Sequence, residues 1–369
     1  MKNFDKVAII GLGLIGGSLA RAMRRAGIVG SISGFGRTQS HLEYAVREGI
    51  VDVATKQLGK AVNNADLVVI STPVGMICEV LTAIKPMLKN NTIVTDVGST
   101  KKDIVECAES LFKSDTTKFV GGHPMAGSED AGVEASREDL FENALCVLTP
   151  TAKTVTPAVK AVREMWEVVG SKVLIIPPED HDLLVAASSH LPHLLAVSLT
   201  QFLSALSHEH EQVIPLLAGG FRDTTRIASS SPEVWRDICL SNRPLIQKVI
   251  KNFKVSLEKV EDLMSHGNGN DIYELFLSAK SFRDTLPNHG RGALLPSYDI
   301  LVDVTDRPGV IGKIATSLGT EGINIKNIYV QHVRELGGGT IIITLEKESD
   351  VNRALNILNE SDFHARKKT

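Results

Sequence analysis

The feature that most constrains the fold is a glycine-rich turn that directly follows a short apolar segment near the start of the sequence. Residues 6–10 (KVAII) are predicted to form a strand, and residues 11–16 (GLGLIG) lead into a predicted helix over 17–25. A GxGxxG motif between a strand and a helix is typical of dinucleotide-binding sheets, because the glycines admit the pyrophosphate and the helix N-terminus faces its charge. The predicted cofactor contacts here are Gly11, Gly13, Leu14, Ile15 and Gly16.

The end of the second predicted strand (residues 31–35) bears on the choice of cofactor. A carboxylate that holds the ribose hydroxyls of NAD is expected there, but Gly36 and Arg37 follow the strand instead. An arginine at that position can pair with the 2′-phosphate of NADP, which local chemistry favours. Arg37 could also stack on adenine with NAD bound, so NAD and NADP both stay open.

Strand and helix signals alternate through the first half of the chain, which predicts a doubly wound parallel sheet of the Rossmann type. The residues predicted to line the cofactor at strand ends are Thr72, Pro73 and Asp96. Further strands are predicted over 145–149 and 173–176, with a helix over 157–169 between them. We interpret residues 1–177 as one dinucleotide-binding domain.

A single histidine follows the strand signal at Phe119 and Val120. His123 stands between a glycine pair and Pro124, at the expected carboxyl edge of the sheet, where open α/β sheets bind ligands. Pro124 restricts the backbone of His123. His123 is therefore the predicted chemical centre, although an isolated histidine is more often a bystander.

The segment 178–286 is predicted to be helical and contains two groups of polar residues. His190 and His193 lie three residues apart, near one helix face. A zinc site is the alternative there, but no HExxH glutamate or nearby Cys or Asp supports it, and no metal is predicted. Arg222 and Arg226 suit a carboxylate-binding site, because a guanidinium can hold a carboxylate bidentately, and a helix with surface arginines is the alternative.

Turn-forming residues over 287–297 predict a linker. The strand and helix signals over 298–369 then follow the order βαββαβ, which predicts a ferredoxin-like domain.

Composition places the chain among ordinary globular proteins. The chain has 369 residues, 43% of them hydrophobic, and a net charge of −3, which gives no electrostatic footprint for nucleic acid or an anionic membrane.

The apolar segment 183–206 contains histidines, proline and hydroxyl residues, so we predict a buried helix pair and no membrane span. The four cysteines show no metal or disulfide spacing, and no signal peptide opens the chain. These features predict a reducing, cytoplasmic location.

Five segments, in order and covering roughly residues 1–290, resemble the prephenate dehydrogenase family. They are residues 11–18 (GLGLIGGS), 95–101 (TDVGSTK), 121–128 (GGHPMAGS), 189–193 (SHLPH) and 219–228 (GGFRDTTRIA) with Trp235-Arg236. The resemblance implies oxidative decarboxylation of prephenate to 4-hydroxyphenylpyruvate with hydride transfer to NAD or NADP, in tyrosine biosynthesis. It also implies that residues 178–286 form a helical dimerisation domain and that the protein is a homodimer.

The family resemblance also suggests roles for individual residues. His123 would take up the proton of the ring hydroxyl, Ser99 would orient His123, and Arg226 would anchor a substrate carboxylate. The supporting residues would be His193, Ser128 and Trp235, with His190 and Arg222 as weaker assignments. Because the imidazole must be neutral to act, turnover is expected to rise with pH through a value of about 6.5.

The C-terminal segment resembles an ACT regulatory domain through residues 306–309 (DRPG) and 322–325 (GINI). The resemblance implies tyrosine as effector, with Pro308, Gly309 and Asn324 near its pocket, whereas a module used only for dimer contacts is the alternative. Two other functions remain open: an arogenate dehydrogenase that uses NADP, and a non-catalytic sensor of nucleotide and amino acid.

Overall fold

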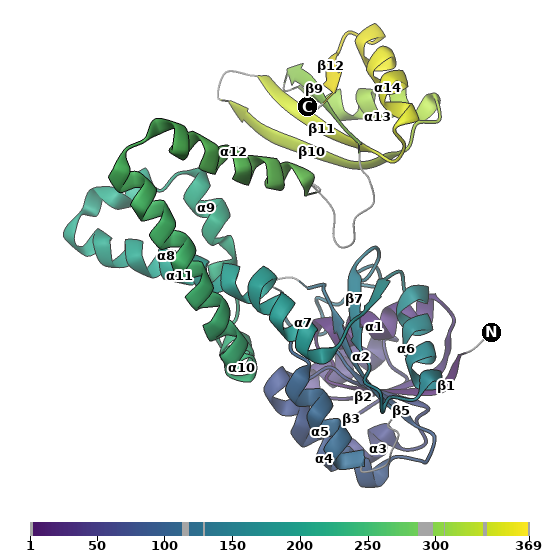
Figure 1. The fold of residues 1–369 in the computed structure, drawn as a ribbon. Helices are drawn as coiled ribbons and strands as arrows, with labels where there is room; N and C mark the ends of the chain where they lie inside the picture. Colours follow the sequence, from purple (N-terminus) through teal and green to yellow (C-terminus); the bar gives the residue numbers. More distant parts are fainter. Residues whose placement is uncertain are drawn as a thin grey trace. The chain divides into compact units, whose positions relative to one another are not determined.

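The computed structural model describes residues 3–112, 118–127, 130–286, 298–305, 307–334 and 338–367. The internal contacts divide the chain into two compact units, and the first extends from the N-terminus to Leu275. It contains the larger sheet and most of the helical segment, and the second unit contains the smaller sheet (Figure 1).

The first unit is built on an eight-stranded sheet with the order β3-β2-β1-β4-β5-β6-β7-β8. The first six strands are parallel, as the alternation of strand and helix predicted, whereas β7 pairs with β6 in the antiparallel direction and β8 follows β7. The reversal is possible because antiparallel neighbours need no crossover helix between them. The strands are β1 (Phe4–Ile10), β2 (Val29–Phe35), β3 (Val53–Thr55), β4 (Leu67–Ile70), β5 (Ile93–Asp96), β6 (Phe119–Pro124), β7 (Leu145–Thr149) and β8 (Lys172–Ile175).

Helices cover both faces of this sheet, so its inner strands are apolar on both sides. In β1, Val7 and Ile9 belong to one core and Ala8 and Ile10 to the other, because successive side chains of a strand point to opposite faces. One face carries α1 (Leu14–Arg25), α2 (Gln39–Arg47) and α6 (Thr156–Val168). The other carries α3 (Leu58–Val62), α4 (Ile77–Ile84) and α5 (Lys102–Phe112). The sequence did not predict the short β3 and α3.

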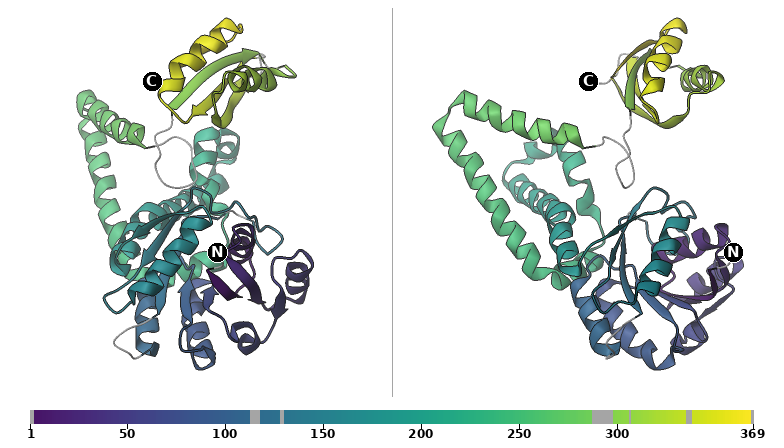
Figure 2. Two further views of the ribbon diagram at one scale, coloured as in Figure 1. Left: turned by 90° about the vertical axis from the view of Figure 1, so that its right-hand side faces the viewer. Right: turned by 45° about the vertical axis from the view of Figure 1, so that its right-hand side comes forward.

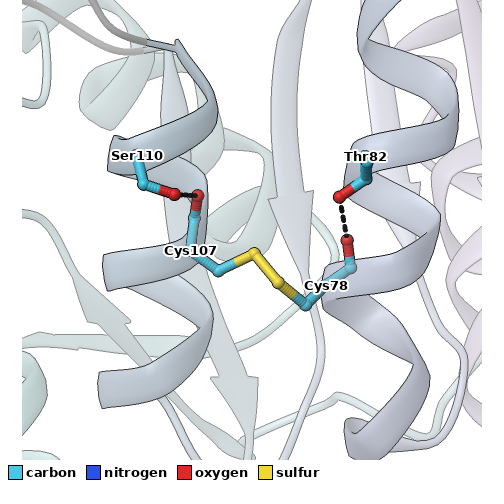
Figure 3. Close-up of a disulfide and its surroundings, with 4 residues drawn as sticks. All are labelled: Cys78, Thr82, Cys107 and Ser110. Atoms are coloured by element: carbon cyan, nitrogen blue, oxygen red, sulfur yellow. Dashed lines mark hydrogen bonds between the residues drawn. A yellow bond between two sulfur atoms is a disulfide. The ribbon is translucent and has the colours of Figure 1, made fainter.

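A disulfide joins two neighbouring helices on the second face. Cys78 of α4 and Cys107 of α5 are bonded, with their Cα atoms 6.2 Å apart (Figure 3). The sequence-based prediction that no cysteines pair is therefore wrong. The two residues are 29 positions apart, and they meet because α4 and α5 pack against each other, which residue spacing does not reveal.

The helical segment begins with one continuous helix, Pro178 to Glu209, in three parts: α7 (Pro178–Val185), the π-helical turn η3 (Ala186–His190) and α8 (Leu191–Glu209). The remaining elements are η4 (Glu211–Leu216), α9 (Gly219–Thr225), η5 (Arg226–Ser229), α10 (Pro232–Ser241), α11 (Arg243–His266) and α12 (Gly269–Thr285). Figure 2 shows α11 as a single long helix.

The helix from Pro178 to Glu209 is long and apolar enough to cross a membrane by length and composition, which for one helix is weak evidence. The prediction that it is buried is wrong for the single chain, because only 22% of its most apolar window is buried. Leu195, Val197, Leu199 and Phe202 of α8 are exposed.

The second unit has the predicted βαββαβ order and its own core. Its four-stranded antiparallel sheet has the order β10-β11-β9-β12, and the core includes Ile300, Ile314 and Leu358. The elements are β9 (Tyr298–Thr305), α13 (Val310–Thr320), β10 (Ile325–Arg334), β11 (Gly338–Leu345), α14 (Ser349–Glu360) and β12 (His364–Lys367).

Candidate active site

The glycine-rich turn after β1 has the geometry of a phosphate-binding loop. Gly11 has φ of +107°, and a Cβ atom there would lie 2.3 Å from the backbone oxygen of Ser71. A Cβ at Gly16 would lie 2.2 Å from the oxygen of Gly11, so both positions need glycine. A Cβ at Gly13 would meet nothing within 4 Å, which leaves open space beside the start of α1.

The N-terminus of α1 is suited to an anion. The first turn has no acidic residue, and among the described residues no side chain caps it or competes for the N–H groups of Leu14, Ile15 and Gly16. Open space at Gly13 beside these donors fits the pyrophosphate of a dinucleotide.

The other predicted cofactor residues fall into two groups. Arg37 is exposed just after β2, and Pro73 is exposed just after β4. The Thr72 hydroxyl oxygen, which also follows β4, is buried and has no hydrogen-bond partner among the described residues. An unsatisfied buried hydroxyl at the carboxyl end of β4 is available to hydrogen-bond a cofactor at the sheet edge where such folds bind their ligands.

Asp96 was predicted to line the cofactor, and the structure shows that its carboxylate has partners within the protein. Its side chain is fully buried and pairs with the ammonium of Lys101, which is also fully buried. Asp96 further accepts hydrogen bonds from the backbone N–H groups of Gly98 (2.8 Å) and Gly122 (3.2 Å). Asp96 therefore fastens β5 to β6 and to the turn after β5.

His123 lies at the carboxyl end of β6 and has a partner that the sequence analysis did not identify. Its Nδ1 is 2.8 Å from Nε2 of His181, and Nδ1 of His181 is 2.7 Å from Oδ1 of Asp182. His181 and Asp182 are buried in α7. We call His123, His181 and Asp182 the His–His–Asp triad.

Asp182 is in turn fixed by the start of α5. Its two carboxylate oxygens accept the backbone N–H groups of Lys101 (2.7 Å) and Lys102 (2.9 Å). A helix N-terminus stabilises a carboxylate through these donors and through the helix dipole. The helical segment and the sheet are thus joined at the triad.

Burial lowers the pKa of His123 well below its usual value, and the neighbouring His181, Lys101 and His190 lower it further. The ring is therefore neutral at neutral pH and able to accept a proton. The sequence-based expectation of a transition near 6.5 is corrected, because His123 lies among these groups and not in water.

A second group of rings surrounds Trp235. His193 stacks on the indole with ring centroids 3.9 Å apart, and His190 meets it edge-on at 5.9 Å. Burial lowers the pKa of His190 to about 4. The side-chain amide of Asn242 donates to the backbone oxygen of Asp182 (2.8 Å) and to Nδ1 of His190 (3.3 Å), which connects this group to the triad.

The guanidinium of Arg226 belongs to the same region. Arg226 begins η5, which packs against α8, and its charge contributes to the lowered pKa of His193, after burial as the main cause. Arg222 lies on α9, and within the part of the chain that the structure describes no side-chain interaction joins it to this group. The structure therefore brings His190, His193, Trp235 and Arg226 together and leaves Arg222 outside.

Two further residues, Ser99 and Ser128, were also predicted to belong to the site. Ser99 is half-buried and makes no side-chain hydrogen bond with any described residue, so His181 is the partner that orients His123 in this structure. Ser128 lies outside the described residues.

The predicted effector residues lie in the second unit. Gly309 has φ of +86° and precedes α13, where the left-handed conformation favours glycine. Pro308 and Asn324 are exposed at the two ends of that helix. A groove between α13 and α14 is lined by other residues, among them Lys313, Thr316 and Glu360. Within the described ranges, no three His, Cys, Asp or Glu side chains are grouped to hold a metal ion.

Comparison with known proteins shows the family to which the chain belongs. Residues 19–175 match the family model "Prephenate dehydrogenase, nucleotide-binding domain", residues 177–278 match "Prephenate dehydrogenase, dimerization domain" and residues 298–362 match "ACT domain". The chain belongs to the prephenate dehydrogenase family. It is therefore an oxidoreductase with a nucleotide-binding domain, a dimerisation domain and an ACT domain.

Individual members of the prephenate dehydrogenase family resemble the chain over most of its length. A prephenate dehydrogenase of Bacillus subtilis (strain 168) is 37% identical and the match covers 95% of this chain and 94% of that protein. A crystal structure of prephenate dehydrogenase from Aquifex aeolicus, in complex with hydroxyphenyl propionate and NAD+, has a TM-score of 0.73 at 35% identity, covering 77% of this chain and 98% of that one. A Synechocystis arogenate dehydrogenase structure has a TM-score of 0.68 at 33% identity, covering 76% and 99%.

Within this prephenate dehydrogenase fold, sequence reasoning missed His181, Asp182, Lys101 and Asn242. The adjacent His-Asp pair was the one available signal, because a carboxylate beside a histidine often orients a catalytic imidazole. Nothing in the sequence showed that α7 would bring that pair to His123.

Proposed function

We propose that the protein catalyses the oxidative decarboxylation of prephenate to 4-hydroxyphenylpyruvate. The observation that carries the proposal is the neutral imidazole of His123, held by buried partners at the carboxyl edge of a dinucleotide-binding sheet. The reaction needs a base for the ring hydroxyl, because that proton must leave as the ring becomes aromatic and carbon dioxide departs. When bound, the nicotinamide supplies the acceptor for the hydride.

The residues of the chain would do three things. His123 accepts the hydroxyl proton, Arg226 holds a substrate carboxylate, and Trp235 with His193 forms a flat surface beside it. Holding the substrate in one orientation is itself a large part of catalysis, because the reacting atoms of substrate and cofactor are then already aligned when the reaction begins.

The test of the proposal is the variant His123→Asn. It should keep cofactor affinity, because His123 is not in the phosphate-binding loop, and lose kcat by ~10² to 10⁴-fold, the range for general base catalysis. Cofactor titration by fluorescence and initial rates with prephenate measure the two effects. Turnover within about threefold of wild type in His123→Asn, for a proton acceptor of this kind, would contradict the proposal.

Arg37 supports NADP as the preferred cofactor. Its guanidinium is exposed after β2, where a 2′-phosphate would lie, and no acidic residue takes that position. Arg37→Ala should weaken NADP binding at least about tenfold, the loss expected for a charge-assisted contact, and leave NAD binding within about twofold. Equal weakening of NAD and NADP binding would instead indicate stacking of Arg37 on the adenine that both cofactors share.

Arogenate is the second candidate substrate. The arogenate dehydrogenase of Synechocystis resembles the chain about as closely as the prephenate dehydrogenase of Aquifex aeolicus does. Initial rates with prephenate and arogenate, each with NAD and NADP, decide between the substrates. Absence of cofactor reduction in all four combinations would favour a sensor instead.

We also propose a cytoplasmic homodimer regulated by tyrosine. The match to a dimerisation domain and the exposed apolar side chains of α8 support the dimer, and the ACT domain supports the effector. Light scattering of the full chain measures its mass in solution, and initial rates measured with added tyrosine show whether tyrosine changes the activity. A monomer at micromolar concentration would reject the dimer, and unchanged rates at saturating tyrosine would reject that effector.

A further inference from the structure

The hydrogen bonds of the His–His–Asp triad determine where each proton lies, beginning at Asp182. A carboxylate only accepts hydrogen bonds, and Asp182 accepts the N–H groups of Lys101 and Lys102 at the start of α5. The third group directed at Asp182 is Nδ1 of His181, 2.7 Å away. Nδ1 of His181 therefore carries a proton and donates a hydrogen bond to Oδ1 of Asp182.

The proton on one nitrogen of His181 decides the role of the other. A neutral imidazole with Nδ1 protonated has a bare Nε2, which is an acceptor. Nε2 of His181 lies 2.8 Å from Nδ1 of His123, so Nδ1 of His123 must be the donor. The remaining nitrogen of His123, Nε2, is left without a proton.

We propose that His181 is a positioning residue, which with Asp182 holds His123 in the tautomer that leaves Nε2 free to accept the substrate proton. The inference rests on the proposed function for its substrate, and it adds a residue to which no role in the reaction had been assigned. The step it serves is balanced: the substrate O–H bond breaks, an N–H bond forms at Nε2 of His123, and the electron pair of the O–H bond remains with the substrate oxygen.

The surroundings explain why such an arrangement is needed. His123 faces His181 and His190 from the helical segment and the buried Lys101–Asp96 pair from the sheet domain. Among the described residues, these two rings and a lysine already paired with Asp96 place no free anion beside His123 to stabilise the imidazolium that forms. Asp182 supplies that charge through His181, as the aspartate does through one histidine in the Ser-His-Asp triad.

Two substitutions at position 181 separate positioning from packing. Asparagine can keep a donor toward Asp182 but does not reach His123, whereas glutamine is long enough to place an acceptor near the position of Nε2. We expect His181→Asn to lose kcat by ~10² to 10⁴-fold, the upper end being the loss known for removing the tautomer-setting aspartate of a serine protease. His181→Gln should recover at least about tenfold of that loss, because it restores one acceptor for His123. KM and cofactor affinity should change less than about threefold in both variants, since neither substitution touches a binding group.

The tautomer itself is measured without any reaction. Long-range ¹H–¹⁵N NMR on the full chain reports which ring nitrogen of a histidine is protonated, and His123→Asn identifies the signals of His123. We expect Nδ1–H with a bare Nε2 in wild type and in His181→Gln, and a shift toward Nε2–H in His181→Asn. The control is His266→Asn, an exposed histidine at the end of α11, which should leave signals and rates unchanged.

The outcomes distinguish this inference from the proposed function. A wild-type His123 found with Nε2 protonated overturns the inference even if prephenate is oxidised. The same holds if His181→Asn keeps kcat within about twofold, because the tautomer-setting bond would then contribute almost nothing. A protein with the expected tautomer that oxidises neither substrate overturns the proposed function alone. If His181→Asn does not fold, the wild-type spectrum and His181→Gln still decide.

Discussion

Lys101 and Asp96 form an ion pair from which solvent is completely excluded, at the carboxyl end of β5. Nζ of Lys101 also donates to the backbone oxygen of Gly122, 2.8 Å away in β6. The pair therefore holds together the two strands whose ends carry the site.

Removing one partner of this pair should be costly. Lys101→Met leaves the Asp96 carboxylate buried without its cation, which typically costs about 3–5 kcal/mol of unfolding free energy. Urea unfolding of the full chain measures the loss. The double variant Lys101→Met/Asp96→Leu should recover part of it, because no unpaired charge remains. A loss below about 1 kcal/mol in the single variant would mean that water reaches the pair.

The low pKa of His123 has a kinetic consequence. Burial depresses the pKa, with His181, Lys101 and His190 adding to the effect, so the basic form persists below the usual value. kcat should therefore be constant from about pH 6.5 upward and fall only at more acid pH. A profile of kcat from pH 5 to 9 measures this. A midpoint at or above about 6.5 in a step shown to be chemical would contradict the assignment of this group.

His190 should make folding stability depend on pH. Its pKa falls to about 4 because the ring is buried, whereas the unfolded chain has the usual value. A depressed pKa gives a stabilising contribution that is complete above about pH 6.5 and is lost as pH falls toward about 4. The loss should be on the order of 3 kcal/mol.

The variant His190→Asn isolates this term, because its amide oxygen can still accept from Asn242. Unfolding free energies at pH 7.5 and 4.5 should differ less in the variant than in wild type. The exposed His266→Asn serves as control and should retain the wild-type difference. Equal differences in wild type and His190→Asn would show that the ring is protonated in the folded state.

Arg226 should contribute mainly to substrate binding. Loss of a charge-assisted bond of about 1.5–3 kcal/mol corresponds to a rise in KM of about 10- to 100-fold in Arg226→Ala. Arg222→Ala is the matched control, since Arg222 is equally exposed but, unlike Arg226, does not contribute to the lowered pKa of His193. Its KM should stay close to wild type. Initial rates over a range of substrate concentrations measure both. A larger rise in KM for Arg222→Ala than for Arg226→Ala would show that Arg222, and not Arg226, holds the substrate carboxylate.

The disulfide between α4 and α5 should stabilise the nucleotide-binding domain. Closing a loop of 29 residues is worth about 3–4 kcal/mol in the chain-entropy description. Cys78→Ser and Cys107→Ser should each lose that amount, and the double variant should lose no more. Cys239→Ser, at an unpaired cysteine, is the control. A reductant should lower the stability of wild type and leave that of Cys78→Ser unchanged. If the reductant leaves the stability of wild type unchanged as well, the two thiols are not bonded.

Local sequence signals were sufficient for much of the architecture. The GxGxxG turn and the apolar strands predicted the sheet because both depend on neighbouring residues, and the βαββαβ order was evident from the same kind of signal. β3 was missed because three residues carry almost no periodicity. The antiparallel direction of β7 was missed because direction depends on the connection and not on the strand.

The site was predictable only in part. His123 could be found because glycines and Pro124 mark its position at a strand end. Its partners could not, because Asp182 and His181 are about sixty residues away and reach it only through the packing of α7 against the start of α5. The pairing of Asp96 with Lys101 could not be predicted, because a carboxylate at a strand end gives no sign of whether a buried lysine pairs with it.

The π-helical turn at Ala186–His190 has a consequence for insertions and deletions. Such a turn accommodates an additional residue within an otherwise regular helix. Each residue rotates the remainder of the helix by about 100°, because the α-helix has 3.6 residues per turn. Because the π-helical turn absorbs that rotation, removing one residue from Ala186–His190 can leave a regular α-helix with His181 and His193 near their present faces. A further insertion or deletion between them would turn the two faces apart by about 100°.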